Sequence, residues 1–179
     1  MTLERQLEQA YANVAQTYEP TLAGVPFRLS TSLLDQAPAP ALDGAEASAD
    51  EEPVEQIPVP YVLLTAAVQE EDPIGTMIHR VDLTIEAGDN VQSASAEGGR
   101  LDAIFQAATR PLSYRLVTAD APAAANPRTL FQLLSDAVQN FQCFGATQRG
   151  NSTETAEDGP LVMRRMVASF FCVTVSPAS

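Results

Sequence analysis

The chain has 179 residues, of which 23 are acidic and 10 are basic, and its formal net charge is -13. This length suits one compact domain with a hydrophobic core and is short for two. The negative charge repels a nucleic-acid backbone unless the arginines gather on one face, and along the sequence they are scattered. We therefore predict a single domain over residues 1–179 that does not recognise nucleic acid.

The cysteines and the N-terminal segment indicate the compartment. Cys143 and Cys172 both lie in apolar segments without CxxC spacing. Two buried thiols in a reducing compartment are the favoured interpretation, and a disulfide is the alternative. The first residues lack the basic and apolar regions of a signal peptide, and no apolar run approaches membrane-spanning length. These features predict a chain that is made in a cytoplasm and not inserted in a membrane.

The first half of the chain predicts one helix and three strands around an acidic insertion. A helical stripe runs from Leu3 to Tyr18, with Thr2 as its N-cap and Pro20 beyond its end. Alternation predicts a short strand over 27–33, and residues 36–56, rich in Pro, Ala and acids, predict a solvated insertion.

A hairpin follows the insertion. The apolar run 57–68 predicts a central strand, and the return strand over 77–86 alternates between an apolar and a polar face. We expect the apolar face to carry Met77, His79, Val81, Leu83 and Ile85. After residues 88–90 the pattern turns helical.

The second half predicts two helices and a second hairpin. One helix covers Leu101 to Ala108 and ends at Pro111, and a short strand follows over 114–117. The next helix begins with Asn126 as N-cap and Pro127 in its first turn. The final hairpin joins strands 141–147 and 161–175 through a polar loop over 149–160. Its last strand has apolar residues on both faces, as in a strand between two layers.

The sequence offers no convincing catalytic set, so we predict that the protein is not an enzyme and needs no cofactor. The single histidine, His79, falls on an apolar strand face, which favours a core or interface position over catalysis. Carboxylates in the turns at 70–72 and 154–158 suit a divalent cation by chemistry, but they lack the spacing of an EF-hand loop. Solvated turns are the favoured interpretation, and no metal is predicted.

Taken in order, these elements resemble the tail-terminator (tail-completion) proteins of long-tailed bacteriophages. The resemblance is carried by VPYVL at 59–63 and MIHRVDLTI at 77–85 in the middle hairpin, by the helix after it, and by the closing segment at 161–175. The acidic insertion and the helix around 126–140 make this chain longer than a minimal member.

The resemblance implies an α+β fold with a mostly antiparallel sheet, helices packed on one side, and assembly as a hexameric ring. Such a ring caps the finished tail tube, stops its polymerisation and offers the docking surface for the head. The implied partners are further copies of the chain, the tail tube protein and a head-completion or neck protein. Packaged DNA would pass through the ring without specific binding. The implied location is the tail or neck of a virion assembled in the host cytoplasm.

A ring needs an interface in which one surface of a subunit meets a different surface of the next. Polar residues on the predicted strands are the candidate intersubunit or partner contacts: Arg80, Asp82, Glu86, Arg164 and Arg165. Acidic residues of the insertion and of the middle turn are the candidates for the lumen or for solvated loops: Glu70, Glu71, Asp72, Asp50, Glu51 and Glu52. An ordinary solvated surface is the alternative for each of them.

Two other functions remain open at this point. Another neck or head-completion connector subunit suits the same acidity and ring geometry, and it would bind the portal side instead of the tail tube. A monomeric cytoplasmic binding domain is the alternative from a different class, and it predicts a closed pocket lined by polar residues.

Overall fold

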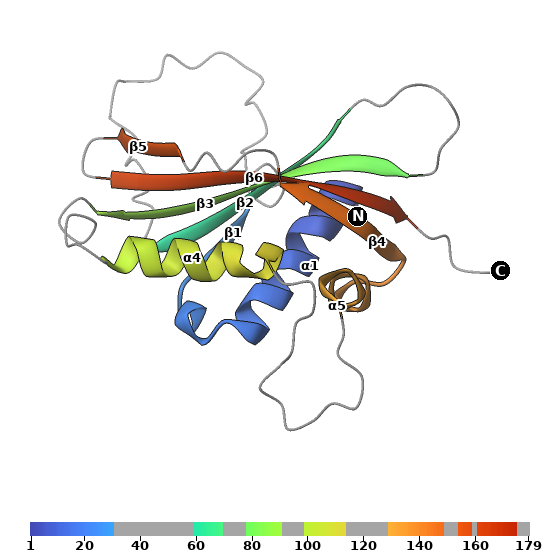
Figure 1. Ribbon diagram of the computed structural model, residues 1–179, viewed down its shortest axis with the longest axis horizontal. Helices are drawn as coiled ribbons and strands as arrows, with labels where there is room; N and C mark the ends of the chain where they lie inside the picture. The colour runs from blue at the N-terminus through green and yellow to red at the C-terminus, as the bar shows by residue number, and fades with distance from the viewer. Residues whose placement is uncertain are drawn as a thin grey trace, which may run out of the picture.

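The computed structural model describes residues 1–30, 59–69, 78–90, 99–113, 129–148, 154–158 and 161–174. Within these ranges the chain forms three α-helices, a short 3-10 helix and a six-stranded mixed sheet (Figure 1). The predicted α+β class is therefore confirmed. The insertion at 36–56 and the predicted strand at 114–117 lie outside the described residues.

The sheet is built from strands that come from both halves of the chain. Their bounds are β1 (Phe27–Leu29), β2 (Tyr61–Val68), β3 (His79–Asn90), β4 (Phe141–Gln148), β5 (Glu154–Asp158) and β6 (Leu161–Thr174). The order is β1-β2-β3-β6-β4, and β5 also pairs with β6. The β1–β2 pair is parallel, and the pairs β2–β3, β3–β6, β4–β6 and β5–β6 are antiparallel.

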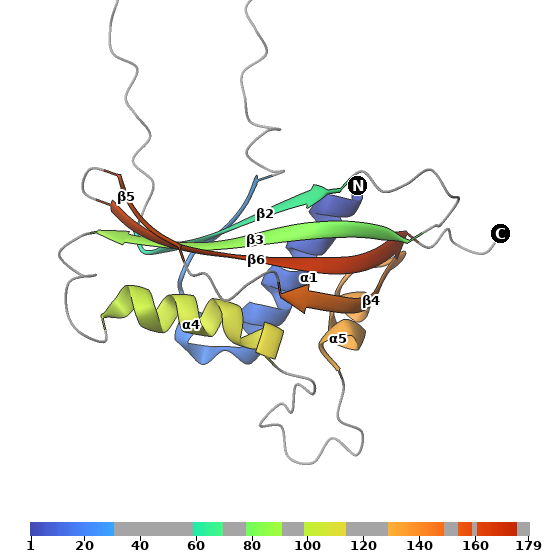
Figure 2. The ribbon, with the colours of Figure 1, turned by 45° about the horizontal axis from the view of Figure 1, so that its top comes forward.

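The three α-helices lie on one side of this sheet. They are α1 (Leu3–Tyr18), α4 (Arg100–Ser113) and α5 (Leu130–Ala137), and the 3-10 helix η1 (Pro20–Leu22) follows α1. Figure 2 shows α4 and α5 below the strands, α1 crossing behind them, and α5 beside β4. No described helix covers the opposite face of β2, β3 and β6. The hydrophobic core therefore fills the space between the helices and one face of the sheet.

Tyr11 of α1 is at the centre of this core. Its hydroxyl donates a 2.8 Å hydrogen bond to the Ala108 carbonyl of α4, and its ring meets Phe170 of β6 edge-on, with the ring centroids 6.2 Å apart. A buried tyrosine keeps its hydroxyl satisfied in this way while its ring contributes a large apolar surface. One side chain thus connects two helices and the sheet, and the predicted helix over residues 3–18 is confirmed.

Ion pairs between arginines of α4 and buried carboxylates hold this helix to neighbouring segments. Arg100 at the start of α4 donates two hydrogen bonds, of 2.6 and 2.8 Å, to the fully buried carboxylate of Asp89. Arg110 at the other end of α4 pairs with the buried Glu19 at 3.0 Å. Burial raises the pKa of Glu19, and the charge of Arg110 opposes that rise. Both ends of α4 are thereby fixed to the rest of the fold.

Several predicted boundaries were wrong. β3 continues to Asn90, beyond the predicted strand end at residue 86, because the long β6 pairs with it that far. α4 continues past Pro111 to Ser113, since the lost backbone donor falls in the last turn and Leu112 still packs against the core.

Two further local predictions were wrong. α5 begins at Leu130 with Thr129 as N-cap, because a capping box forms between Thr129 and Gln132, whereas Asn126 was predicted to cap it. The polar segment 149–160 contains the strand β5, which pairs with β6 along residues 161–165. Backbone pairing with a long neighbouring strand does not require apolar side chains, so the polar sequence gave no sign of this strand.

His79 is not a core residue. It shares the alternation of Val81, Leu83 and Ile85, which are buried as predicted, but its own side chain is exposed. His79 is the first residue of β3, and burial on that face begins only at Val81. Of the predicted core or interface position, the core position was therefore wrong, and the interface position stays a prediction.

Candidate functional site: the open face of the sheet

The face of the sheet away from the helices is the most distinctive surface of the described residues, and we call it the open face. The pairing of β3 with β6 places Arg80 opposite Phe171, Asp82 opposite Ser169, Thr84 opposite Val167 and Glu86 opposite Arg165. These residues alternate with buried residues that point to the helices, as the pleat of a strand requires. The open face consists of Tyr61, Leu63, Thr65, Arg80, Asp82, Thr84, Glu86, Met163, Arg165, Val167, Ser169 and Phe171.

The middle of the open face is hollowed into a depression of about 400 Å³. Its lining residues come from all three strands: Leu63, Thr65, Thr84, Glu86, Arg165 and Val167. Leu63 and Val167 are only half-buried. An open hollow of this kind, with Thr84 and Glu86 on its middle strand and Leu63 and Val167 on the strands to either side, suits contact with another protein surface better than enclosure of a small molecule.

An ion pair with a tyrosine borders the hollow. Arg165 donates to Glu86 Oε2 through Nε and Nη2, at 3.1 and 2.8 Å, and the Tyr61 hydroxyl donates to Glu86 Oε1 at 3.1 Å. Burial raises the pKa of Tyr61 to about 12, and the nearby negative charge of Glu86 adds to the rise. The Glu86 side chain is 9% exposed and that of Arg165 is 48% exposed, so the guanidinium remains accessible from outside.

The ring of Tyr61 needs the glycine on the neighbouring strand. Tyr61 is paired with Gly88, and a Cβ atom at Gly88 would overlap the tyrosine ring. An aromatic side chain that lies across a glycine of the adjacent strand covers backbone that would otherwise be exposed. Gly88 therefore lets the tyrosine reach Glu86.

A second polar cluster lies toward the other end of the open face. The Ser169 hydroxyl donates to Asp82 Oδ1, and Arg80 Nε lies 3.5 Å from the same oxygen. The Arg80 Nε atom is buried and donates no hydrogen bond to the described residues. The cluster joins β3 to β6 across the face and neutralises the charge of Asp82.

The structure brings four of the predicted contact residues together and separates the fifth. Arg80, Asp82, Glu86 and Arg165 lie on the open face, although Glu86 is largely buried instead of solvated. Arg164 points to the helix side and pairs with Asp102 of α4 at 2.6 Å. The predicted acidic residues lie outside the described part of the chain: Glu70, Glu71, Asp72, Asp50, Glu51 and Glu52.

Eight members of the open face were not predicted as site residues, among them Tyr61, Ser169 and Thr84. For Thr84 the sequence signal was the period-two alternation in residues 77–86, which assigns faces within one strand. Tyr61 and Ser169 lie on the neighbouring strands β2 and β6. The cross-strand register, which selects their partners, comes from pairing between segments about 80 residues apart, such as Glu86 and Arg165. Short-range patterns carry no information on that register.

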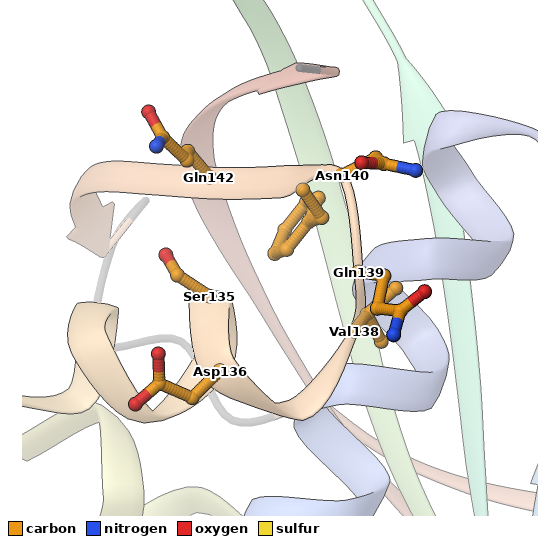
Figure 3. Close-up of a pocket in the computed structure, with 7 residues that line it drawn as sticks. Ser135, Asp136, Val138, Gln139, Asn140 and Gln142 are labelled. Carbon is orange, nitrogen blue, oxygen red and sulfur yellow. The ribbon is translucent and has the colours of Figure 1, made fainter. Parts of the chain in front are cut away.

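A second hollow lies at the turn between α5 and β4 (Figure 3). In the figure the side chains of Ser135, Asp136, Gln139 and Asn140 point in different directions and not toward one centre. Ser135 already accepts a hydrogen bond from the Cys143 amide at 3.1 Å and donates one to the Phe131 carbonyl at 2.8 Å. The hydroxyl therefore fastens α5 to β4, and the hollow is a consequence of that turn.

The ranges that the structure describes contain neither a cluster of potential metal ligands nor a membrane-spanning helix. No group of three or more His, Cys, Asp or Glu side chains there is arranged to hold a metal ion. No helix in the same ranges is both long and apolar enough to span a bilayer.

Comparisons with known proteins assign neither a family nor a function to this chain. The chain matches no family model, and no curated protein matches it either.

Proposed function

We propose that this chain is a virion structural subunit, a bacteriophage tail terminator that forms a ring at the end of the tail tube. The proposal rests on the resemblance of the middle hairpin, the following helix and the closing strand to that family. The ring, with six subunits in the family it resembles, would stop tube polymerisation and present the joining surface for the head. The proposed partners are a second copy of the chain, the tube protein and a neck protein.

The observation that carries the proposal is the open face. A sheet with helices on one side only leaves its other face to water or to a partner. Here that face combines half-buried apolar side chains with ion pairs that are already formed, and protein interfaces have this composition of apolar centre, aromatics and arginine. Because Glu86 and Asp82 are neutralised within the subunit, a partner can cover them without leaving an unpaired charge.

The fold and the charge agree with this assignment. Among the described strands, the pairs other than β1–β2 are antiparallel and the described helices lie on one side, which is the arrangement that the resemblance implies. The net charge of -13 would repel DNA from a ring lumen, so that the genome passes without adhering. An open face that meets a different surface on the next subunit is the heterologous contact from which rings are built.

A charge placed on the open face tests the proposed interface. Thr84→Arg puts a cation in the middle of the hollow, and we expect it to abolish ring formation in native mass spectrometry. The free energy of unfolding of the separated subunit should change by less than about 1 kcal/mol, since Thr84 is only half-buried. Gln106→Arg, on the exposed side of α4, is the matched control and should form rings like the unmodified chain.

Two outcomes would oppose the proposal. Rings that form equally well in Thr84→Arg and in the unmodified chain would exclude the open face as the interface. Rings that bind the portal side and ignore tail tubes would instead identify a head-completion or other neck connector.

A further inference from the structure

The two cysteines, far apart in the sequence, face each other across neighbouring strands. Cys143 of β4 is paired with Cys172 of β6 in the antiparallel register. Both carry free thiols, and both are buried on the helix side of the sheet, where Cys172 is fully covered. The favoured prediction of two buried thiols agrees with this, and the alternative of a disulfide is the one that would have made them neighbours.

The hydrogen-bond pattern identifies which kind of antiparallel pair they form. The Cys143 amide donates to Ser135 Oγ of α5, at 3.1 Å, and so points away from β6. A residue whose amide turns away from the partner strand belongs to a non-hydrogen-bonded pair, in which the Cα atoms approach to about 4.5 Å. That separation lies within the range of about 4.4–6.8 Å that disulfides span.

The chain next to Cys143 is also able to adjust. The register between β4 and β6 shifts between Cys143 and Gly145, so that Phe144 is an extra residue in the edge strand. A bulge of this kind interrupts the ladder and makes the strand easier to bend locally. The small movement that brings two sulfur atoms to bonding distance therefore falls on the irregular edge strand and not on the central β6.

We propose that Cys143 and Cys172 are a thiol–disulfide pair, which a small-molecule disulfide such as oxidised glutathione converts to an intrachain disulfide between β4 and β6. The Cys143 thiolate attacks one sulfur of the reagent, forms a mixed disulfide and releases one glutathione thiolate. The Cys172 thiolate then attacks the Cys143 sulfur, forms the intrachain bond and releases the second glutathione. Two cysteine thiols are oxidised, one reagent disulfide is reduced to two thiols, and the two cysteine protons pass to the released thiolates through solvent.

The order of attack follows from the surroundings of each thiol. Cys143 lies on an edge strand and is slightly exposed, so the reagent reaches it first when β4 opens. The neighbouring Cys143 thiol, followed by burial, raises the pKa of Cys172. Since thiolates are the attacking species, the reaction should be faster in mildly alkaline buffer than at neutral pH. The product would join β4, and with it α5, covalently to the centre of the sheet.

The experiment is oxidation of the purified, reduced full chain with oxidised glutathione under native conditions. After acid quenching, the chain is alkylated in denaturant and analysed by intact mass and by non-reducing peptide mapping. We expect a chain that has lost two hydrogen atoms, takes up no alkylating reagent and yields one peptide pair linked through Cys143 and Cys172. Its thermal unfolding midpoint should lie above that of the reduced chain.

Variants and alternative products make the outcome decisive. Cys143→Ser and Cys172→Ser should each give at most a glutathione adduct, with no intrachain bond. The proposal is overturned if both thiols of the unmodified chain are still alkylated after oxidation, if a glutathione adduct at Cys143 never resolves, or if only disulfide-linked dimers form. None of these outcomes depends on ring assembly.

Discussion

At the scale of single residues, Tyr61 and Gly88 are cross-strand partners, and the tyrosine ring occupies the space that a side chain at position 88 would need. Gly88→Ala places a Cβ atom into the tyrosine ring, so the ring must move and its hydroxyl must leave Glu86. We expect a loss of about 1–3 kcal/mol in the free energy of unfolding, as for other overpacked sites. Urea denaturation measures it.

The control for this change removes the ring. In a Tyr61→Leu background, Gly88→Ala should have a much smaller effect, because the obstructing atoms are gone. An equal loss in both backgrounds would show that the glycine is needed for a reason other than the tyrosine.

Asp89 gives the fold a defined dependence on pH. Burial on its own would raise the pKa of this carboxyl, but the hydrogen bonds from Arg100 and from the Asn90 amide outweigh burial and lower the pKa overall. A carboxyl whose pKa is lower in the folded than in the unfolded chain stabilises the fold at pH values above its unfolded-state pKa of about 4. That contribution is lost as the pH falls through the folded-state pKa. The stability contributed by Asp89 is therefore lost below about pH 4.

Asp89→Asn keeps the shape of the side chain and removes its charge. We expect a loss of about 2 kcal/mol in the free energy of unfolding at neutral pH. This difference from the unmodified chain should shrink in acid. Denaturant titrations at neutral pH and near pH 3 give both values, with Asp102→Asn as a control at a more exposed ion pair. A difference that stays constant with pH would contradict the role given to the charge.

At the scale of elements, α1 does more than cover the sheet. In the described residues β1 pairs with β2 from Val62 to Leu64, and beyond that point the Ala66 amide faces no described strand. The buried Glu8 of α1 accepts a 2.8 Å hydrogen bond from this amide and another from the Ser30 hydroxyl. A side chain thus completes the sheet edge where the short β1 ends, and covering an edge in this way also protects it from pairing with other chains.

Glu8→Ala removes the acceptor of the buried Ala66 amide. Such a change typically lowers the free energy of unfolding by about 1–3 kcal/mol, because the amide is removed from water without gaining a hydrogen-bond partner. We expect the thermal midpoint to fall accordingly. Gln16→Ala, at an exposed position of the same helix, should change it little. Equal midpoints for the two variants would exclude the edge-completing role.

The sequence predicted the elements that have a strong local periodicity. It did not predict those whose existence or length depends on pairing with a distant strand. The stripe from Leu3 to Tyr18 and the alternation of Val81, Leu83 and Ile85 are local patterns, and both were confirmed. β5 and the last residues of β3 exist because the long β6 offers backbone partners, and this cannot be seen in their own side chains. The faces of Arg164 and Arg165 likewise depend on the register of β6.

The candidate site was predicted in part for the same reason. Placing Arg80, Asp82 and Glu86 on one strand face needs only the period of two. The burial of Glu86 and its hydrogen bonds with Arg165 and Tyr61 could not be predicted in this way. They depend on strands that come from distant parts of the chain. The hollow between them is a property of three strands together and has no local signature.

At the scale of the whole molecule, the described residues have a two-sided character. One face of the sheet is sealed by α1, α4 and α5, with ion pairs that hold both ends of α4. The other face has its charges paired and its apolar side chains half-exposed. A chain with one face covered by helices and one face without a described cover has a surface left to bury, as the proposed ring requires.

Negative-stain imaging of the purified chain mixed with tail tubes tests the central claim most directly. The proposed function predicts closed rings of one size, seated at one end of each tube, with tubes that no longer elongate when fresh tube protein is added. Particles that remain monomeric at high concentration and leave both tube ends free to grow would contradict it.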